Sequence, residues 1–106
     1  MSDPGKLKHR LVLEAPVETP DGAGGVARSY VHAATLWAEV TPLSARERVL
    51  ADASGTSVTH RIRIRTRGDV TRRHRLRLGV RIFRIATVRE DASGGFLSIE
   101  AEERRA

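Results

Sequence analysis

The side chains that could carry out chemistry in this sequence are few and scattered. Four histidines (His9, His32, His60 and His74) are the only candidates for transition-metal ligands in a chain without cysteine, and none has H-x-x-x-H or H-E-x-x-H spacing. The carboxylates are dispersed, and no serine or threonine occupies a nucleophile-elbow sequence. The glycines at 22–25 do not open a helix, so they form no phosphate cradle. We therefore expect no catalytic residue, no bound metal, no cofactor and no enzymatic activity.

Arginine is the strongest chemical signal. The segment from Arg61 to Arg89 contains eleven arginines and one acid, Asp69, which gives +10, whereas the whole chain carries +6, so the remaining residues sum to −4. Such a split suits binding of a polyanion, and it equally suits self-association in which a basic face meets an acidic face of the next copy. Phe83 is the only aromatic residue in the basic half, which disfavours a binder that stacks bases.

Four of these arginines form a stripe. Arg61, Arg63 and Arg65 alternate with apolar residues, and Arg67 follows in the same register. Alternation of this kind predicts a strand with an arginine-bearing outer face. The stripe could contact a neighbouring subunit, bind DNA phosphates without sequence preference, or be a solvated face, and the sequence leaves these alternatives open.

Period-2 alternation predicts six strands that position these side chains. Pro16 and Pro20 should end the first strand, and a flexible exposed loop is expected over 18–29 because of its turn-forming residues. We expect the charged end of the chain, Glu102–Arg105, to fray. The expected strands are 7–14, 30–40, 57–65, 75–78, 81–89 and 96–101.

One short helix is expected between the second and third strands. Ser44 is a plausible N-cap, Glu47 stands in the capping-box position, and Gly55 can terminate the helix. A helix this short is marginal without packing, so we expect it to order against a partner.

Length and composition complete the fold prediction. A chain of 106 residues has room for one hydrophobic core, so residues 1–106 are expected to form a single domain. The fold class is all-β: a small antiparallel six-stranded barrel or sandwich with one helical insertion, the barrel being favoured because closure removes exposed edges. No segment is apolar enough to cross a membrane, and the start of the chain lacks a signal-peptide core, which predicts action in the cytosol or in something assembled there. The expected core residues are Leu11, Trp37, Ile62, Ile64, Phe83 and Ile85.

Four blocks at characteristic spacings resemble the phage head-tail joining family. Their joint occurrence is specific and covers nearly the whole chain, although Ala45 and Thr66 differ from the residues common in the family. The blocks are Gly5–Leu11, Trp37–Val40 with Pro42–Ser44 and Arg46–Glu47, Thr59–Arg65, and Arg81–Ile85.

The resemblance implies a head-completion protein, also called head-closure, stopper or connector, of a tailed phage, a prophage or a gene transfer agent. Such proteins are small β-barrels that form a dodecameric ring below the portal and its adaptor ring, and the tail or tail-terminator ring docks on the other side. DNA passes through the centre. The expected location is the neck of a virion or phage-like particle made in the bacterial host cytoplasm.

The resemblance also implies which segments make contacts. The segment 41–57 is expected to project from the barrel and to make ring contacts or gate the channel. In a ring built from heterologous interfaces, the stripe could face Glu100, Glu102 and Glu103 of the next subunit, or part of it could line the channel with Arg46 or Arg48. The alternative function is a small basic barrel that binds nucleic acid non-specifically. The candidate residues of the segment are Ser44, Arg46, Glu47, Arg48, Leu50 and Asp52.

Overall fold

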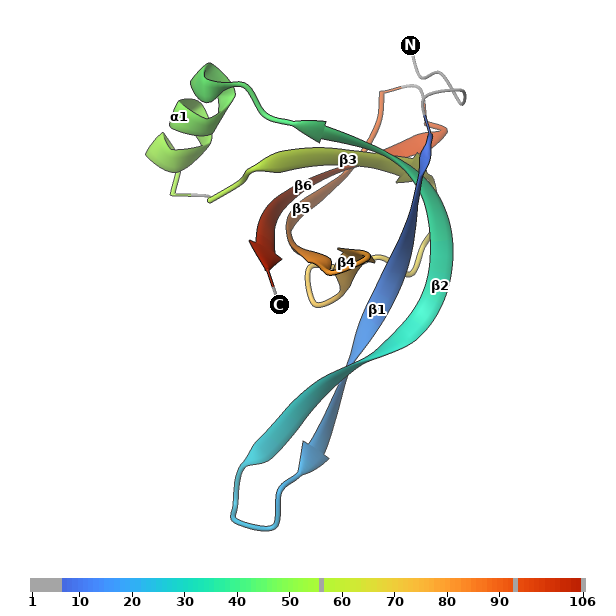
Figure 1. The fold of residues 1–106 in the computed structure, drawn as a ribbon, viewed down its shortest axis with the longest axis vertical. Coiled ribbons are helices and arrows are strands. Elements are labelled where there is room, and N and C mark those ends of the chain that lie inside the picture. Colours follow the sequence, from blue (N-terminus) through green and yellow to red (C-terminus); the bar gives the residue numbers. More distant parts are fainter. Residues whose placement is uncertain (1–6, 56, 93, 106) are drawn as a thin grey trace.

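The computed structural model describes residues 7–55, 57–92 and 94–105 and contains six strands and one helix in that part of the chain. Gly5 and Lys6, which begin the first family block, lie outside the described residues. Figure 1 shows a barrel from which a long ribbon and a helix project in different directions. The elements are β1 (His9–Pro20), β2 (Val26–Pro42), α1 (Ala45–Ala53), β3 (His60–Arg65), β4 (Arg75–Leu78), β5 (Arg81–Glu90) and β6 (Phe96–Arg105).

The strands form one closed antiparallel barrel in the order β1-β2-β3-β6-β5-β4. Closure comes from β4, which pairs with β1 through Val12↔Arg77, Leu13↔Leu76 and Glu14↔Arg75. A closed sheet has no free edge within the barrel, so its backbone groups are paired without a partner chain. The predicted all-β class, the six strands and the helical insertion are confirmed, and the barrel is the form adopted.

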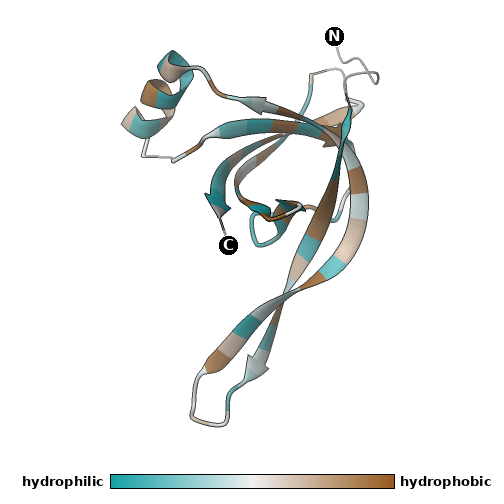
Figure 2. Ribbon diagram, viewed as in Figure 1, coloured by the Kyte–Doolittle hydropathy of each residue, from teal (hydrophilic) through white to brown (hydrophobic). Residues whose placement is uncertain are grey.

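Inward-facing side chains of alternating strand residues build the core. Leu11, Ile62, Ile64, Phe83 and Ile85 are at most 1% exposed, as expected. In Figure 2 the barrel strands alternate between apolar and polar residues along their length. The core is therefore mostly aliphatic, and Phe83 is its largest fully buried side chain.

Trp37 is the exception, and the prediction that it belongs to the core is wrong. Its neighbours Leu36 and Ala38 are buried, so the period of two along β2 turns Trp37 to the outer face, where it is 53% exposed. The Arg10 guanidinium lies 5.3 Å from the centre of the indole ring. Strand parity, rather than side-chain size, decided this orientation.

The expected loop at 18–29 is instead the end of a two-stranded arm, which we define as Ala15–Val31. Register pairs run from Ala15↔Val31 to Pro20↔Val26, and only the five residues 21–25 form the turn. Beyond Glu14, β1 pairs only with β2, so its other edge is open. Proline lacks an N–H group, and an open edge tolerates Pro16 and Pro20 because no partner strand needs a hydrogen bond from them there. Gly22 and Gly24 adopt positive φ values in the turn.

Helix α1 begins and ends as predicted. The Ser44 hydroxyl accepts from the Glu47 N–H at 3.2 Å and Glu47 Oε1 accepts from the Ser44 N–H at 3.0 Å, which is a complete capping box. Gly55, at φ 82°, follows the helix. Within the described ranges no helix is long and apolar enough to cross a membrane.

The C-terminal residues do not fray. Strand β6 continues to Arg105 because β5 pairs with it along that whole length, from Glu90↔Leu97 to Arg81↔Arg105. The side chains of Glu102 and Glu103 are mostly covered, at 19% and 17% exposed. The sequence showed only charge in this segment, whereas pairing with β5 and ion pairs to its arginines keep it in the sheet.

Candidate interaction surfaces

Helix α1 is attached to the barrel through a few side chains. Leu43, Val58 and Ala86 form a small buried cluster against which Ala51 packs. Glu47 Oε2 accepts a hydrogen bond from an Arg61 Nη atom at 2.9 Å. The hydrogen bond from the Ser44 backbone, followed by the bond from Arg61, lowers the pKa of Glu47. Ser44 and Glu47, expected at a ring interface, therefore also fix the helix on its own barrel.

The rest of the helix faces outward. None of its residues is buried, and Val49 and Leu50 are 65% and 63% exposed. Arg46, Arg48 and Asp52, which the sequence marked as interface candidates, are exposed as well. The structure thus places four of the six candidates on a free helix surface that includes an apolar pair.

The arginine stripe runs along β3 and the turn that follows, and most of it is paired within the chain. Arg61 pairs with Glu47 and Arg63 with Asp91, while Arg67 Nε lies 2.6 Å from Asp69 Oδ1. Arg65 is exposed and lies 5.8 Å from the centre of the Phe96 ring. The stripe therefore sits on the outer face, as expected, with most of its charge already compensated.

The acids expected to receive a neighbour's stripe also have partners in the same chain. Thr87 and Arg89 donate to Glu100 at 3.0 and 3.4 Å. Ser57, Arg84 and Arg104 donate to Glu102, and these bonds lower its pKa, the bond from Ser57 having the largest effect. Arg81 donates to Glu103 through two bonds. A stripe-to-acid contact between subunits would have to share or exchange these bonds.

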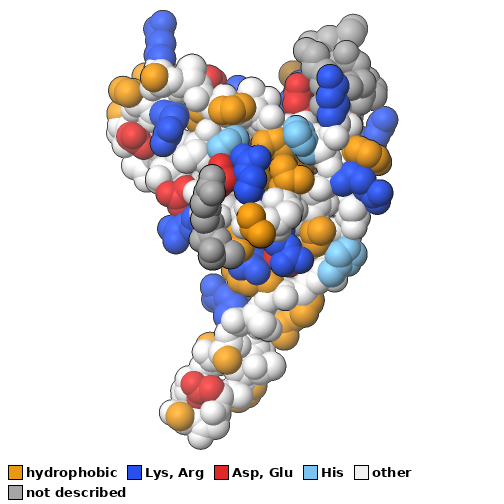
Figure 3. Space-filling view, in the orientation of Figure 1, with side chains coloured by type: hydrophobic (Ala, Val, Ile, Leu, Met, Phe, Trp, Pro, Cys, Tyr) orange, Lys and Arg blue, Asp and Glu red, His pale blue; other side chains and the backbone are white. Residues whose placement is uncertain are grey.

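A second basic surface lies where the arm joins the barrel, and the sequence analysis did not find it. An open cleft of about 440 Å³ separates the arm from the outer face of β4, β5 and β6. Figure 3 shows basic side chains where the arm meets the barrel, interspersed with hydrophobic ones. We call it the basic cleft; its lining residues are Pro16, Arg28, Tyr30, Arg72, Arg73, His74, Arg75, Ile82, Arg84 and Arg104.

Strand register assembles the cleft from distant parts of the chain. Pairing of Arg75 with Arg84 and of Ile82 with Arg104 sets these residues side by side on the barrel wall. On the arm, the Tyr30 ring lies 3.9 Å from the Arg75 guanidinium carbon. Arg72-Arg73-His74-Arg75 is a visible basic run in the sequence, but nothing local indicates that Arg28, Arg84 and Arg104 would join it.

The histidines provide no evidence of metal chemistry. In the part of the chain that the structure describes, no group of three or more His, Asp or Glu side chains could hold a metal ion. His60 packs edge-on against Phe83, with ring centres 5.2 Å apart. Burial lowers the pKa of His60, with Glu103 opposing that shift and Arg81 and Arg48 adding to it. This is the environment of a side chain in the barrel wall.

Comparison with known proteins identifies the family. Residues 2–104 match the family described as phage head completion protein. A chain in the virion of a native gene transfer agent particle is 37% identical, with coverage of 93% of this chain and 96% of that one and a TM-score of 0.68. Protein SF1141 from Shigella flexneri 2a is 28% identical, with 96% of both chains covered and a TM-score of 0.79. No curated protein matches the chain. The chain belongs to the phage head completion protein family, and its role in head completion is structural.

Proposed function

We propose that this protein closes the DNA-filled head of a phage or phage-like particle and provides the surface on which the tail docks. Copies of the chain would form a dodecameric ring in the neck, below the portal and its adaptor ring, with tail-terminator or tail proteins on the far side and DNA passing through the centre. The observation that carries the proposal is the 37% identity, over nearly the full length of both chains, to a virion component of a gene transfer agent. We assign the protein no catalytic role, and synthesis in the host cytoplasm is part of the proposal.

The shape of the molecule supports assembly through its projections. The barrel itself has no free edge, so neighbouring copies cannot add strands to it and would associate through other surfaces. The arm and helix α1 leave the barrel in different directions, and each exposes apolar residues: Val26 and Val31 on the arm, Val49 and Leu50 on the helix. Two different surfaces on one subunit are what a closed ring of heterologous contacts requires.

The segment 41–57 is the proposed ring-contact or channel-gating segment. Its outward side chains would face a neighbouring subunit or the channel; they belong to Arg46, Arg48, Leu50 and Asp52. Glu47 would keep its ion pair with Arg61 of the same chain. Within the stripe, Arg65 is the best candidate for an external contact because it is exposed. We treat residues 1–106 as one head-completion domain.

This function can be tested by deleting the native gene and supplying variant genes in its place, and then examining the particles that assemble. The double substitution Val49→Asp and Leu50→Asp places charge in the exposed apolar pair, and we expect unjoined heads and tails and loss of packaged DNA. Val80→Asp is the control, since Val80 is an apolar residue in the turn between β4 and β5 that is even more exposed than Val49 and Leu50.

Cryo-electron microscopy of the same particles provides the direct readout. Ring density for this chain between portal and tail would support the proposal and would identify what the stripe faces. A complete neck that lacks the chain would rule the proposal out. Charge reversal by Arg65→Glu separates the two hypotheses for the stripe: weakened assembly indicates a neighbouring subunit, and normal assembly with DNA leakage indicates the channel.

A further inference from the structure

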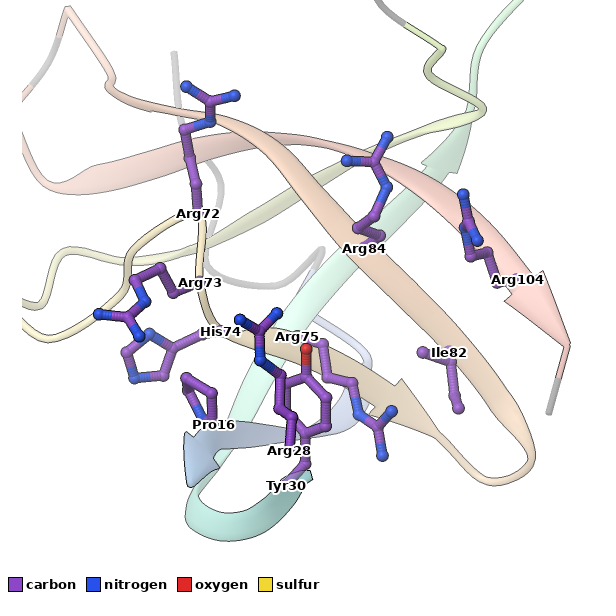
Figure 4. A pocket seen from close by; sticks show the side chains of 10 residues that line it. All are labelled: Pro16, Arg28, Tyr30, Arg72, Arg73, His74, Arg75, Ile82, Arg84 and Arg104. Atoms are coloured by element: carbon purple, nitrogen blue, oxygen red, sulfur yellow. The ribbon is translucent and has the colours of Figure 1, made fainter. Parts of the chain in front are cut away.

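The basic cleft gathers arginines from four separate parts of the chain around one hollow. Arg28 comes from the arm, Arg72 and Arg73 from the turn before β4, and Arg75, Arg84 and Arg104 from three adjacent strands of the barrel. Figure 4 shows these side chains extending from the arm, from the turn before β4 and from the barrel strands that line the cleft. The chain thus concentrates positive charge at a concave surface, where the field of the charges adds.

Carboxylates fix these arginines without neutralising them. Glu14 is only 4% exposed and pairs with both Arg75 and Arg77. Glu18 pairs with Arg28 and Arg73, and Glu102 with Arg84 and Arg104. Each of these carboxylates is therefore shared by two arginines. In the stripe, by contrast, Arg61, Arg63 and Arg67 pair with three different carboxylates.

Arg72 is the clearest sign of an external ligand. It is exposed, it lines the cleft, and it has no hydrogen bond or ion pair with any residue that the structure describes. The side chains of Arg73 and Arg104 are also open to solvent, at 72% and 63% exposed. Their guanidinium groups keep free N–H donors that an anion can reach.

A second copy of this chain is a poor match for that charge. Every copy carries +6, and Glu100, Glu102 and Glu103, the acids of the last strand, already accept bonds from their own chain. The only apolar lining residues, Pro16, Tyr30 and Ile82, are interspersed among arginines, unlike the apolar centre typical of a protein interface. The ligand should therefore be a foreign polyanion.

We propose that the basic cleft binds the phosphodiester backbone of DNA without regard to base sequence. Arginine forks match phosphate oxygens bidentately, and a surface assembled from several strands can contact successive phosphates. Base stacking is not expected, because Tyr30 is the only Phe, Tyr or Trp side chain among the described residues that line the cleft, and the Arg75 guanidinium already packs against it, 3.9 Å from the ring centre. The assignment concerns a site distinct from both the stripe and helix α1.

Fluorescence anisotropy of a labelled mixed-sequence DNA duplex, titrated with the full chain at several salt concentrations, tests the cleft. The triple variant Arg72→Ala, Arg73→Ala, Arg104→Ala should weaken binding on the order of a hundredfold and make the dependence of log K on log salt shallower by about three. The matched control, Lys8→Ala, Arg10→Ala, Arg89→Ala, removes the same charge from exposed positions outside the cleft, the stripe and helix α1, and it should retain most of the affinity. Arg72→Ala alone, which disturbs no described contact, should reduce the slope by about one.

Three results would overturn the proposal. One is the absence of salt-dependent binding to the duplex, and another is an equal loss of affinity in the triple variant and its control. The third is preferential binding of polyglutamate over DNA, which would assign the cleft to an acidic protein segment. The proposal does not rest on the ring: a chain that enters the particle neck but fails to bind DNA refutes the cleft and leaves the proposed function standing.

Discussion

The barrel and its two projections differ in how their residues are stabilised. In the barrel, Leu11, Phe83 and Ile99 are fully buried, and strand pairing continues around the closed sheet. The arm beyond Ala15 has a single pairing, β1 to β2, and helix α1 has no buried residue. The free energy of folding must therefore come mainly from the barrel, while the projections remain available for contacts with other molecules.

The difference indicates that stability and interaction surfaces are separated in this chain. A two-stranded ribbon and a helix of 9 residues are both marginal in isolation, so each depends on its attachment to the barrel. Glu14 and Arg75 lie at the base of the arm, and the capping box and Arg61 hold the helix. Substitutions in the core, at these attachments and in the projections should have graded effects.

The largest effect is expected in the core. Phe83→Ala removes a ring that is 0% exposed, and it should lower the free energy of unfolding by about 3–5 kcal/mol. Trp37→Ala removes a larger ring from the outer face and should cost about 1 kcal/mol or less, mainly the contact with Arg10. Urea denaturation monitored by circular dichroism measures both, and similar losses for the two variants would contradict the assigned inward face of β5 and outward face of β2.

The attachment of the arm comes next. Glu14→Ala leaves Arg75 and Arg77 without their shared, buried carboxylate and should cost about 1–3 kcal/mol. Glu18→Ala removes a carboxylate that also serves two arginines but is more exposed, so a loss of about 1 kcal/mol or less is expected. Equal destabilisation in urea titrations would show that burial of Glu14 contributes nothing.

The attachment of the helix should be weaker still. Ser44→Ala deletes the N-cap acceptor, and we expect a local loss of about 1 kcal/mol. Hydrogen exchange of the amides in 45–53 should accelerate while exchange in the barrel strands is unchanged. Ser44→Asp restores an acceptor and serves as the control; acceleration throughout the barrel would mean that the helix is part of the cooperative core.

His60 in the barrel wall should make the stability of the protein depend on pH, and Arg48 of helix α1 should influence that dependence. Its pKa in the folded state is lowered by burial, and Arg48 of helix α1 contributes to that shift. A lowered folded pKa means that the unfolded state binds the proton more readily, so this contribution to stability is complete above about pH 6.5 and is lost as pH falls through the folded pKa. His60→Gln should flatten that part of the profile of unfolding free energy against pH, and Arg48→Ala, by raising the folded-state pKa of His60, should make the loss of stability at low pH smaller. An unchanged profile in His60→Gln would assign the dependence to other groups.

The smallest effect on stability is expected from shortening the arm. Replacing residues 18–28 by Asn-Gly removes exposed ion pairs and a free ribbon, and it should change the free energy of unfolding by about 1 kcal/mol or less. The same variant should fail to join heads to tails in particle complementation. Normal assembly with a shortened arm would show that the arm makes no essential ring contact. A large loss in the free energy of unfolding would show that the arm, and not only the barrel, stabilises the fold.

Much of the fold could be predicted because its signals are local. Alternation along each strand identified Leu11, Ile62, Ile64, Phe83 and Ile85 as core, and Ser44 with Glu47 identified the start of the helix. The arm was missed because prolines and glycines are signals of loops, and only the open edge of β1 makes Pro16 and Pro20 compatible with a strand. Trp37 was expected in the core because it lies in the middle of a strand beside Leu36 and Val40, but the period of two along β2 buries Leu36 and Ala38 and turns Trp37 outward.

The sequence by itself determined the strand periodicity, the capped helix and the family, since each depends on residues within one segment or on the order of segments. The tertiary structure alone decided the basic cleft and the pairing of the stripe. Arg28, Arg72, Arg84 and Arg104 meet only because β4 closes the barrel against β1 and the register of β5 with β6 aligns their outer faces. Contacts between residues this far apart in the chain follow from strand register, which no local pattern specifies.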